Sequence, residues 1–122
     1  VSAAEDVFPG LGQRLQSFSY RVPTSIVSSA VLILQLDKDI DLVKLKKRFY
    51  SFEKSQDYSV IKNSTKPLVS LDYVRENFSV IIDHRWTKME NKTLLKIVYW
   101  YDNEWGYSNR VVDLINLISK KY

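Results

Sequence analysis

The side chains best suited to chemistry are concentrated in residues 99–110, whose sequence is YWYDNEWGYSNR. Most of these side chains can donate or accept a hydrogen bond. A strand-like apolar run precedes them and a helical spacing of apolar residues follows them, so we expect a strand to meet the N-terminus of a helix here. At such a junction, backbone N–H groups and a carboxamide can bind a polar ligand. The segment therefore predicts a ligand site, and a plain polar turn is the alternative interpretation.

Two other polar features have simpler interpretations. His84 follows Asp83, and adjacent residues in a strand point to opposite faces, so we expect a surface or strand-end histidine rather than half of a catalytic pair. Asp37, Asp39 and Asp41 lack the glycine and the terminal glutamate of a calcium-binding loop. We expect Asp39 or Asp41 to cap a helix instead.

The composition excludes several kinds of site. The chain has 122 residues, no cysteine and one histidine, so this sequence holds no disulfide, no thiolate nucleophile and no cysteine or multi-histidine metal site. The net charge is +4, and the basic residues 44–48 lie on a helical pattern with apolar residues between them. This pattern favours a solvated helix face and makes nucleic-acid binding an unfavoured alternative.

The chain shows no pattern typical of a membrane or secreted protein. No apolar run reaches the length that spans a bilayer, and no signal-peptide pattern opens the chain, so we expect a cytoplasmic protein without membrane contact. The first residue is valine, and residues 1–9 resemble the end of a helix. We therefore interpret the chain as a piece of a longer protein.

The spacing of apolar residues predicts an α+β fold with a mainly antiparallel, mixed sheet and helices on one face. Residues 26–36 are almost continuously apolar, which predicts a central strand covered on both faces. Apolar stripes predict one helix that begins near Asp41 and another over residues 105–120. The other predicted strands are residues 15–22, 58–62, 68–73, 77–83 and 93–101, with turns at 63–67 and 88–92.

Residues 100–114, WYDNEWGYSNRVVDL, closely resemble the C-terminal signature of phosphorylating glyceraldehyde-3-phosphate dehydrogenases. A second block, with VFP at 7–9, YRVPT at 20–24 and VS at 27–28, resembles another motif of that family. Residues 67–72 also fall where the family has a similar strand. Because these blocks follow the family's order, the resemblance spans essentially the whole chain. The related erythrose-4-phosphate dehydrogenases share part of the pattern.

The resemblance implies that residues 1–122 form a single partial catalytic domain without the Rossmann domain that binds the cofactor. The family's nucleophilic cysteine and the histidine that activates it lie in the absent part, so the resemblance assigns no catalytic residue here and implies an inactive chain. The complete enzyme would oxidise glyceraldehyde 3-phosphate to 1,3-bisphosphoglycerate in glycolysis, with erythrose 4-phosphate as the alternative substrate. A free-standing, non-catalytic interaction or assembly module of the same fold is the alternative function.

The resemblance also implies roles for individual residues. Arg21 matches a phosphate-binding arginine, and Tyr101 matches a tyrosine near the nucleophile. Asn103 matches the asparagine that holds the nicotinamide carboxamide, Glu104 an acidic residue beside it, and Tyr107 a tyrosine that packs by the nicotinamide. NAD or NADP would serve the complete enzyme, and we expect this chain alone to bind neither. The implied partners are the missing N-terminal part, further copies in a homo-oligomer (a tetramer in the family), the phosphorylated aldehyde and phosphate.

Overall fold

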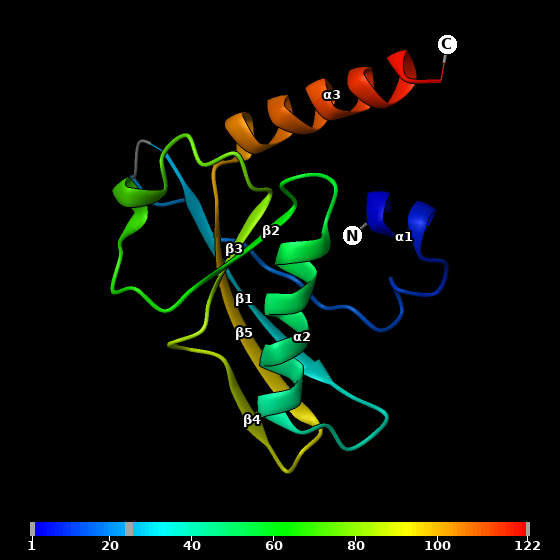
Figure 1. Ribbon diagram of the computed structural model, residues 1–122. Helices are drawn as coiled ribbons and strands as arrows, with labels where there is room; N and C mark the ends of the chain where they lie inside the picture. The colour runs from blue at the N-terminus through cyan, green and yellow to red at the C-terminus, as the bar shows by residue number, and fades with distance from the viewer. Residues whose placement is uncertain (1, 24–25, 122) are drawn as a thin grey trace.

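The computed structural model describes residues 2–23 and 26–121, which form a five-stranded sheet, three α-helices and one 3-10 helix (Figure 1). The elements in chain order are α1 (Ser2–Val7), β1 (Ser28–Gln35), α2 (Leu42–Ser55), β2 (Ile61–Ser64), the 3-10 helix η1 (Ser70–Tyr73), β3 (Val80–Asp83), β4 (Lys88–Glu90), β5 (Leu94–Tyr101) and α3 (Asn103–Ser119). Only one α-helix, α2, lies between strands in this order, and the predicted α+β class is confirmed.

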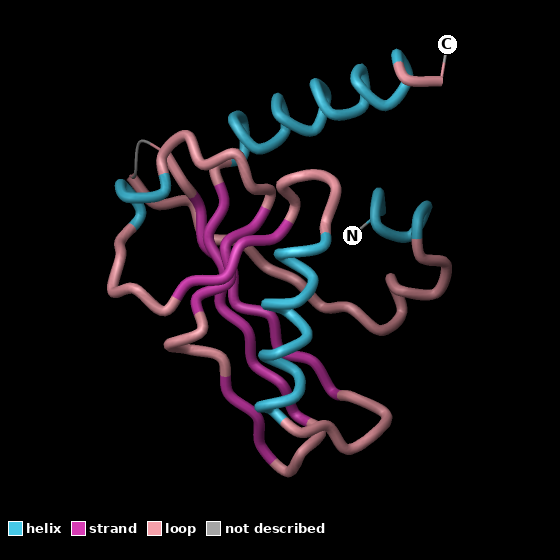
Figure 2. Tube along the Cα trace, viewed as in Figure 1, coloured by secondary structure: helices cyan, strands magenta, loops and turns pink. Residues whose placement is uncertain are grey.

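β5 lies inside the sheet, which is strongly twisted (Figure 2). The strand order is β1-β5-β3-β2, and β4 also pairs with β5. β1 is antiparallel to β5, with Ser28 opposite Tyr101, whereas β2 and β3 are parallel. The sheet is therefore mixed, as predicted. The β1–β5 register also places the chain that enters β1 beside the chain that leaves β5.

α2 covers one face of the sheet (Figure 1). Its side chains Leu42, Leu45 and Phe49 pack against buried residues of β3 and β5. Full burial of a leucine or phenylalanine is worth roughly 1.5–3 kcal/mol, so even a partly buried stripe of three holds the helix on the sheet. The Asp41 carboxylate accepts a hydrogen bond from the Lys44 N–H at 2.9 Å, which confirms the predicted cap.

The opposite face of the sheet is covered at one end by a loop. Ile81 and Ile82 are neighbours in β3 and belong to different apolar clusters, because adjacent strand residues point to opposite faces. Ile82 faces α2, whereas Ile81 packs with Tyr73 of η1. The Tyr73 ring stacks on Trp100 with 5.5 Å between the ring centroids. The segment around η1 therefore serves as the second layer of the domain here.

The prediction for residues 26–36 is partly wrong. The strand is present from Ser28 to Gln35, but β1 is an edge strand in the described part of the chain. Its side chains on the face away from α2 are open to solvent, with Val31 60% and Ile33 64% exposed. A continuous apolar run predicts cover on both faces, and no segment among the described residues supplies the second cover.

Residues 15–22 do not form a strand, although their side chains alternate. A strand needs a neighbour for its backbone hydrogen bonds, and none of the described residues pairs with this segment. Phe18 and Tyr20 are 85% and 81% exposed and contact each other edge to face. Residues 68–73 are also not a strand, because Asp72 Oδ2 accepts a hydrogen bond from Val69 N and closes the turn of η1.

The remaining strands are found with shifted bounds. The strand predicted over 58–62 begins at Ile61, since the Gln56 side chain occupies the backbone groups of Val60 and Ile61. The strand predicted over 77–83 is confined to β3, and β5 begins one residue later than predicted. Residues 88–92, predicted as a turn, contain the short strand β4 and then the turn.

α3 confirms the predicted C-terminal helix but extends away from the sheet (Figure 1). The spacing predicts one apolar stripe on this helix, but the four side chains of that stripe are 37–59% exposed. They are Val111, Leu114, Ile115 and Ile118. No helix in the described part of the chain is long and apolar enough to cross a membrane.

His84 lies at a strand end, as predicted, directly after β3, but it is buried rather than on the surface. The Asn63 amide group donates to Glu53 Oε2 at 2.6 Å, so its Oδ1 atom must accept the proton on His84 Nε2 at 2.7 Å. His84 Nδ1 then accepts from the Thr87 hydroxyl at 3.1 Å. This arrangement suits the neutral ring. Burial lowers the pKa of His84, and the nearby Lys46 lowers it further.

We expect the free energy of unfolding to fall as the pH falls below about 6.5, the ordinary pKa of histidine. Below that pH the unfolded chain takes up a proton that the folded chain resists, so stability is lost by up to about 1.4 kcal/mol per pH unit. Because His84 is the single histidine, His84→Gln should abolish this slope. Urea unfolding at pH 7.5, 6.5 and 5.5 measures it, and equal slopes for both proteins would contradict the prediction.

Candidate functional site

A polar cavity of about 440 Å³ lies where β1 begins and β5 ends. Three segments line it: the chain before β1, the first residue of β1, and the junction of β5 with α3. The lining residues are Ser19, Tyr20, Arg21, Val22, Ile26, Val27, Ser28, Tyr101, Asn103 and Glu104. We call this cavity the junction pocket. It contains four of the five residues that the sequence predicts for a site: Arg21, Tyr101, Asn103 and Glu104.

The antiparallel register of β1 and β5 assembles the junction pocket. Ser28 is opposite Tyr101, so the segment that carries Arg21 reaches the start of α3 although the two are far apart in the chain. Val27 turns the chain into β1 with a φ of +66°. That conformation is strained for a β-branched residue, and the surrounding structure must hold it. Val27 is buried against Tyr73 and Ile81, and this packing stabilises its backbone conformation.

The start of α3 forms one wall of the junction pocket. Asp102 is 2% exposed and caps the helix, since its carboxylate accepts a hydrogen bond from the Trp105 N–H at 3.1 Å. The predicted strand–helix junction is therefore confirmed. The first bond inside the helix joins Gly106 N to Asp102 O at 2.8 Å. The N–H groups of Asn103 and Glu104 precede that bond, and such groups at a helix start are ready donors for a ligand.

The two charged side chains of the junction pocket are those of Arg21 and Glu104. Neither of them is in an ion pair among residues 2–23 and 26–121. A guanidinium suits phosphate or carboxylate oxygens, whereas a carboxamide can both donate to and accept from another amide. The pocket can therefore hold a molecule with an anionic group and an amide. Neither a cysteine nor a histidine lines the pocket among the described residues, because the sequence has no cysteine and its one histidine, His84, is buried elsewhere.

Tyr107 does not line the junction pocket. Its side chain is 71% exposed on the first turns of α3. Its predicted contact with a ligand stays a prediction. Thr24 of the YRVPT motif lies outside the described residues. Conversely, the sequence analysis assigned no individual role to Ser28, Tyr20 or Asp102, although Asp102 lies in the predicted segment 99–110 and an aspartate directly before a helix is a readable capping signal.

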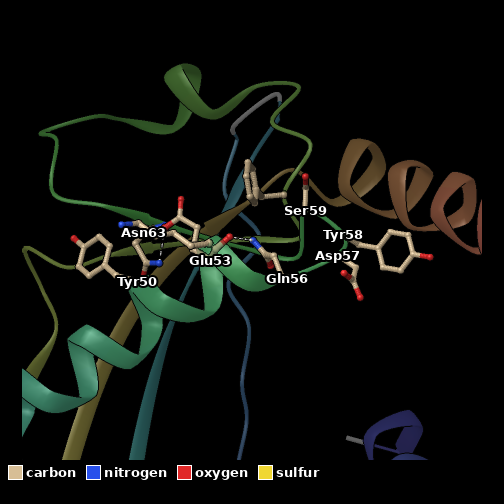
Figure 3. Close-up of a pocket in the computed structure, with 9 residues that line it drawn as sticks. Tyr50, Glu53, Gln56, Asp57, Tyr58, Ser59 and Asn63 are labelled. Atoms are coloured by element: carbon tan, nitrogen blue, oxygen red, sulfur yellow. Dashed lines mark hydrogen bonds between the residues drawn. The ribbon is translucent and has the colours of Figure 1, made fainter.

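A second hollow of about 470 Å³ lies between the end of α2 and β2 (Figure 3). Its polar side chains do not converge: Tyr58 and Asp57 point away from Glu53 in the close-up. Glu53 accepts hydrogen bonds from the backbone and side chain of Asn63, at 2.9 and 2.6 Å. These polar groups serve the internal structure, so the junction pocket is the better candidate site although it is slightly smaller.

Comparisons with known proteins point to one family. The family described as "Glyceraldehyde 3-phosphate dehydrogenase, C-terminal domain" matches residues 1–103. Glyceraldehyde-3-phosphate dehydrogenase 2 of Staphylococcus aureus (strain MRSA252) is 37% identical over 118 residues, which are 97% of this chain and 34% of that protein. The protein of the same name from Bacillus subtilis (strain 168) is 37% identical over 115 residues, with 94% of this chain and 34% of that protein covered.

A relative from a third organism gives the same result. The cytosolic glyceraldehyde-3-phosphate dehydrogenase of Gracilaria gracilis is 36% identical over 120 residues, which are 98% of this chain and 36% of that protein. The chain thus spans about a third of the length of the curated relatives that it matches.

Proposed function

Since the chain belongs to the glyceraldehyde-3-phosphate dehydrogenase family, to its C-terminal domain, we propose that it forms part of the catalytic domain of an NAD(P)-dependent phosphorylating aldehyde dehydrogenase. The observation that carries the proposal is the junction pocket, in which Arg21, Asn103 and Glu104 meet. In the complete enzyme the substrate would be glyceraldehyde 3-phosphate. The chain's part is to bind and orient, because it holds neither a cysteine nor an accessible histidine.

Arg21 would bind a phosphate group. Arg21 is an exposed residue that lines the pocket, and its guanidinium can offer two parallel N–H groups to two phosphate oxygens. The start of α3, which also lines the pocket, adds the backbone donors and the favourable dipole that an anion or amide oxygen needs.

Asn103 would hold the carboxamide of a nicotinamide. The fit rests on chemistry that is present in the pocket: the Asn103 carboxamide can donate to the carbonyl of a second carboxamide and accept from its amino group. When bound, the nicotinamide ring supplies the hydride acceptor. Asn103 decides only how that ring is oriented, and Glu104 and Tyr101 flank it. The packing of Tyr107 against the ring is part of the same proposal.

The rest of the enzyme would cover the apolar surfaces that this chain leaves open. They are the free edge and open face of β1, the alternating segment 15–22 and the apolar side of α3. Exposed apolar surface on this scale is typical of a protein interface. The family match ends at residue 103, where α3 begins and leaves the sheet. We propose that these surfaces pack against the N-terminal part of the enzyme and against further copies in a cytoplasmic homo-oligomer.

The composition of the assembly tests the proposal. Native and denaturing mass spectrometry on the protein from its own cells should show either a longer polypeptide or a complex with a second polypeptide that carries the missing cysteine. The 122-residue chain alone should form no NADH or NADPH from glyceraldehyde 3-phosphate, and addition of the second polypeptide should restore the activity. Masses of only 14.3 kDa and its multiples would contradict the proposal and favour a non-catalytic assembly module.

A further inference from the structure

The first turn of α3 is fastened to the segment 75–79, which contributes no residue to the junction pocket. The main connection is Asp102. One carboxylate oxygen accepts from the Trp105 N–H at 3.1 Å, and the other accepts from the Arg75 N–H at 2.9 Å. Asp102 therefore joins the helix start to a turn far away in the sequence, which is more than a helix cap requires.

Further contacts support the same connection. The Arg75 guanidinium lies 5.8 Å from the centre of the Trp105 ring, and Trp105 Nε1 donates to Asn77 Oδ1 at 2.8 Å. Arg110 donates to the backbone oxygen of Asn77 at 3.3 Å. Gly106 brings the helix backbone close to the chain, since a Cβ atom there would lie 3.5 Å from the oxygen of Phe78.

The residues that this connection holds are the ones that line the pocket. Asn103 and Glu104 are exposed and lie between two anchored residues, Asp102 and Trp105. An exposed side chain that must meet a ligand gains from a backbone that is fixed to within a fraction of an ångström. A misplacement of about 1 Å at such a site can cost a hundredfold in rate.

We propose that Asp102 is a positioning residue: by bridging Arg75 and Trp105 it holds the Asn103 carboxamide in place for the nicotinamide. The inference rests on the proposed function, since it needs Asn103 to contact that ring. It assigns to the segment 75–79 a role in cofactor binding without a contact to the cofactor.

The variant Asp102→Asn separates this role from helix capping. Asparagine caps a helix about as well as aspartate, but its second polar atom is a donor and cannot accept from the Arg75 N–H. The matched control is Asp41→Asn in α2, where the carboxylate caps a helix through Lys44 N and makes no second bridge. A pure cap predicts the same behaviour for both variants.

Two measurements decide the question. In the complete enzyme, we expect Asp102→Asn to raise the KM for the nicotinamide cofactor about tenfold and to change kcat less, whereas Asp41→Asn changes neither. In the 122-residue chain, the backbone order parameter of Asn103 should fall from the rigid value of about 0.85 toward about 0.6 in Asp102→Asn only. Should Asp102→Asn not fold, Asn77→Ala removes a single outer contact and should shift both readouts in the same direction by a smaller factor.

An Asp102→Asn variant with an unchanged order parameter and an unchanged cofactor KM would overturn the inference, even if its melting temperature is lower. The variant Asn103→Ala tests the proposed function separately. If it leaves the cofactor KM unchanged, the nicotinamide assignment fails, and the Asp102 inference fails with it. If only Asn103→Ala raises the KM, the assignment stands and the inference alone is refuted.

Discussion

Replacing Arg21 by alanine in the complete enzyme is expected to lower kcat/KM for the phosphorylated aldehyde by about a hundredfold. Each hydrogen bond to a charged group is worth about a tenfold change or more, and a bidentate guanidinium makes two. The structure favours this role because Arg21 lines the junction pocket and is in no ion pair among the described residues. The concentration of phosphate needed for half-maximal rate should rise as well.

Two variants sharpen this test. Arg21→Lys keeps the charge but loses the planar fork, so it should recover only part of the lost rate. Arg14→Ala removes an arginine of the same segment that lies outside the pocket, 3.9 Å from the carboxylate of Asp37, and should leave the kinetics unchanged. Steady-state rates at varied phosphate and aldehyde give both constants. Unchanged kinetics in Arg21→Ala would refute the phosphate assignment.

Replacing Asp83 by alanine is expected to destabilise the chain by about 3 kcal/mol. The side chain is fully buried and accepts hydrogen bonds from Arg85 Nε at 2.9 Å and from Trp100 Nε1 at 3.4 Å. Burial alone would raise the pKa of Asp83, but the hydrogen bonds from Arg85 and Trp100 outweigh it, so the pKa lies below its usual value. The carboxylate therefore stabilises the fold above about pH 4 and loses that effect in stronger acid.

Urea unfolding at pH 7 measures the loss in Asp83→Ala. The matched control is Asp37→Ala. Asp37 is exposed and its ion pair with Arg14 is long, at 3.9 Å, so the free energy of unfolding should change by no more than about 0.5 kcal/mol. Asp83→Asn keeps the shape of the side chain but loses one acceptor. Its expected stability therefore lies between those of Asp83→Ala and Asp37→Ala. A loss below about 1 kcal/mol in Asp83→Ala would show that the bonds to Arg85 and Trp100 contribute little net stability.

Features that depend on neighbouring residues were predictable. The helix cap at Asp41 and the strand–helix junction at residues 99–110 follow from side chains within one helical turn. The α2 stripe also follows from local spacing, and the structure packs Leu42, Leu45 and Phe49 of it, partly buried, against the sheet. In each case the signal and its partner are close in the chain, so the amino-acid order contains both.

Features that depend on a distant partner were not predictable in the same way. Residues 15–22 have the pattern of a strand, yet no described segment pairs with them. β1 has the sequence of a covered strand but lies at an edge. Both patterns indicate which side chains would be buried, but they do not identify the segment that would cover them. His84 was expected at the surface or at a strand end, yet it is buried. Asn63 and Thr87, both outside its immediate sequence neighbours, form hydrogen bonds with its two ring nitrogens and allow the burial.

The sequence by itself determined the family, the α+β class and the side chains available for binding: Arg21, Tyr101, Asn103, Glu104 and Tyr107. Only the tertiary structure decided which of them meet. The antiparallel register of β1 and β5 brings Arg21 to Asn103, and the helix geometry leaves Tyr107 outside the pocket. The physical reason is that side-chain chemistry belongs to each residue, whereas proximity is set by backbone pairing between strands that are far apart in the chain.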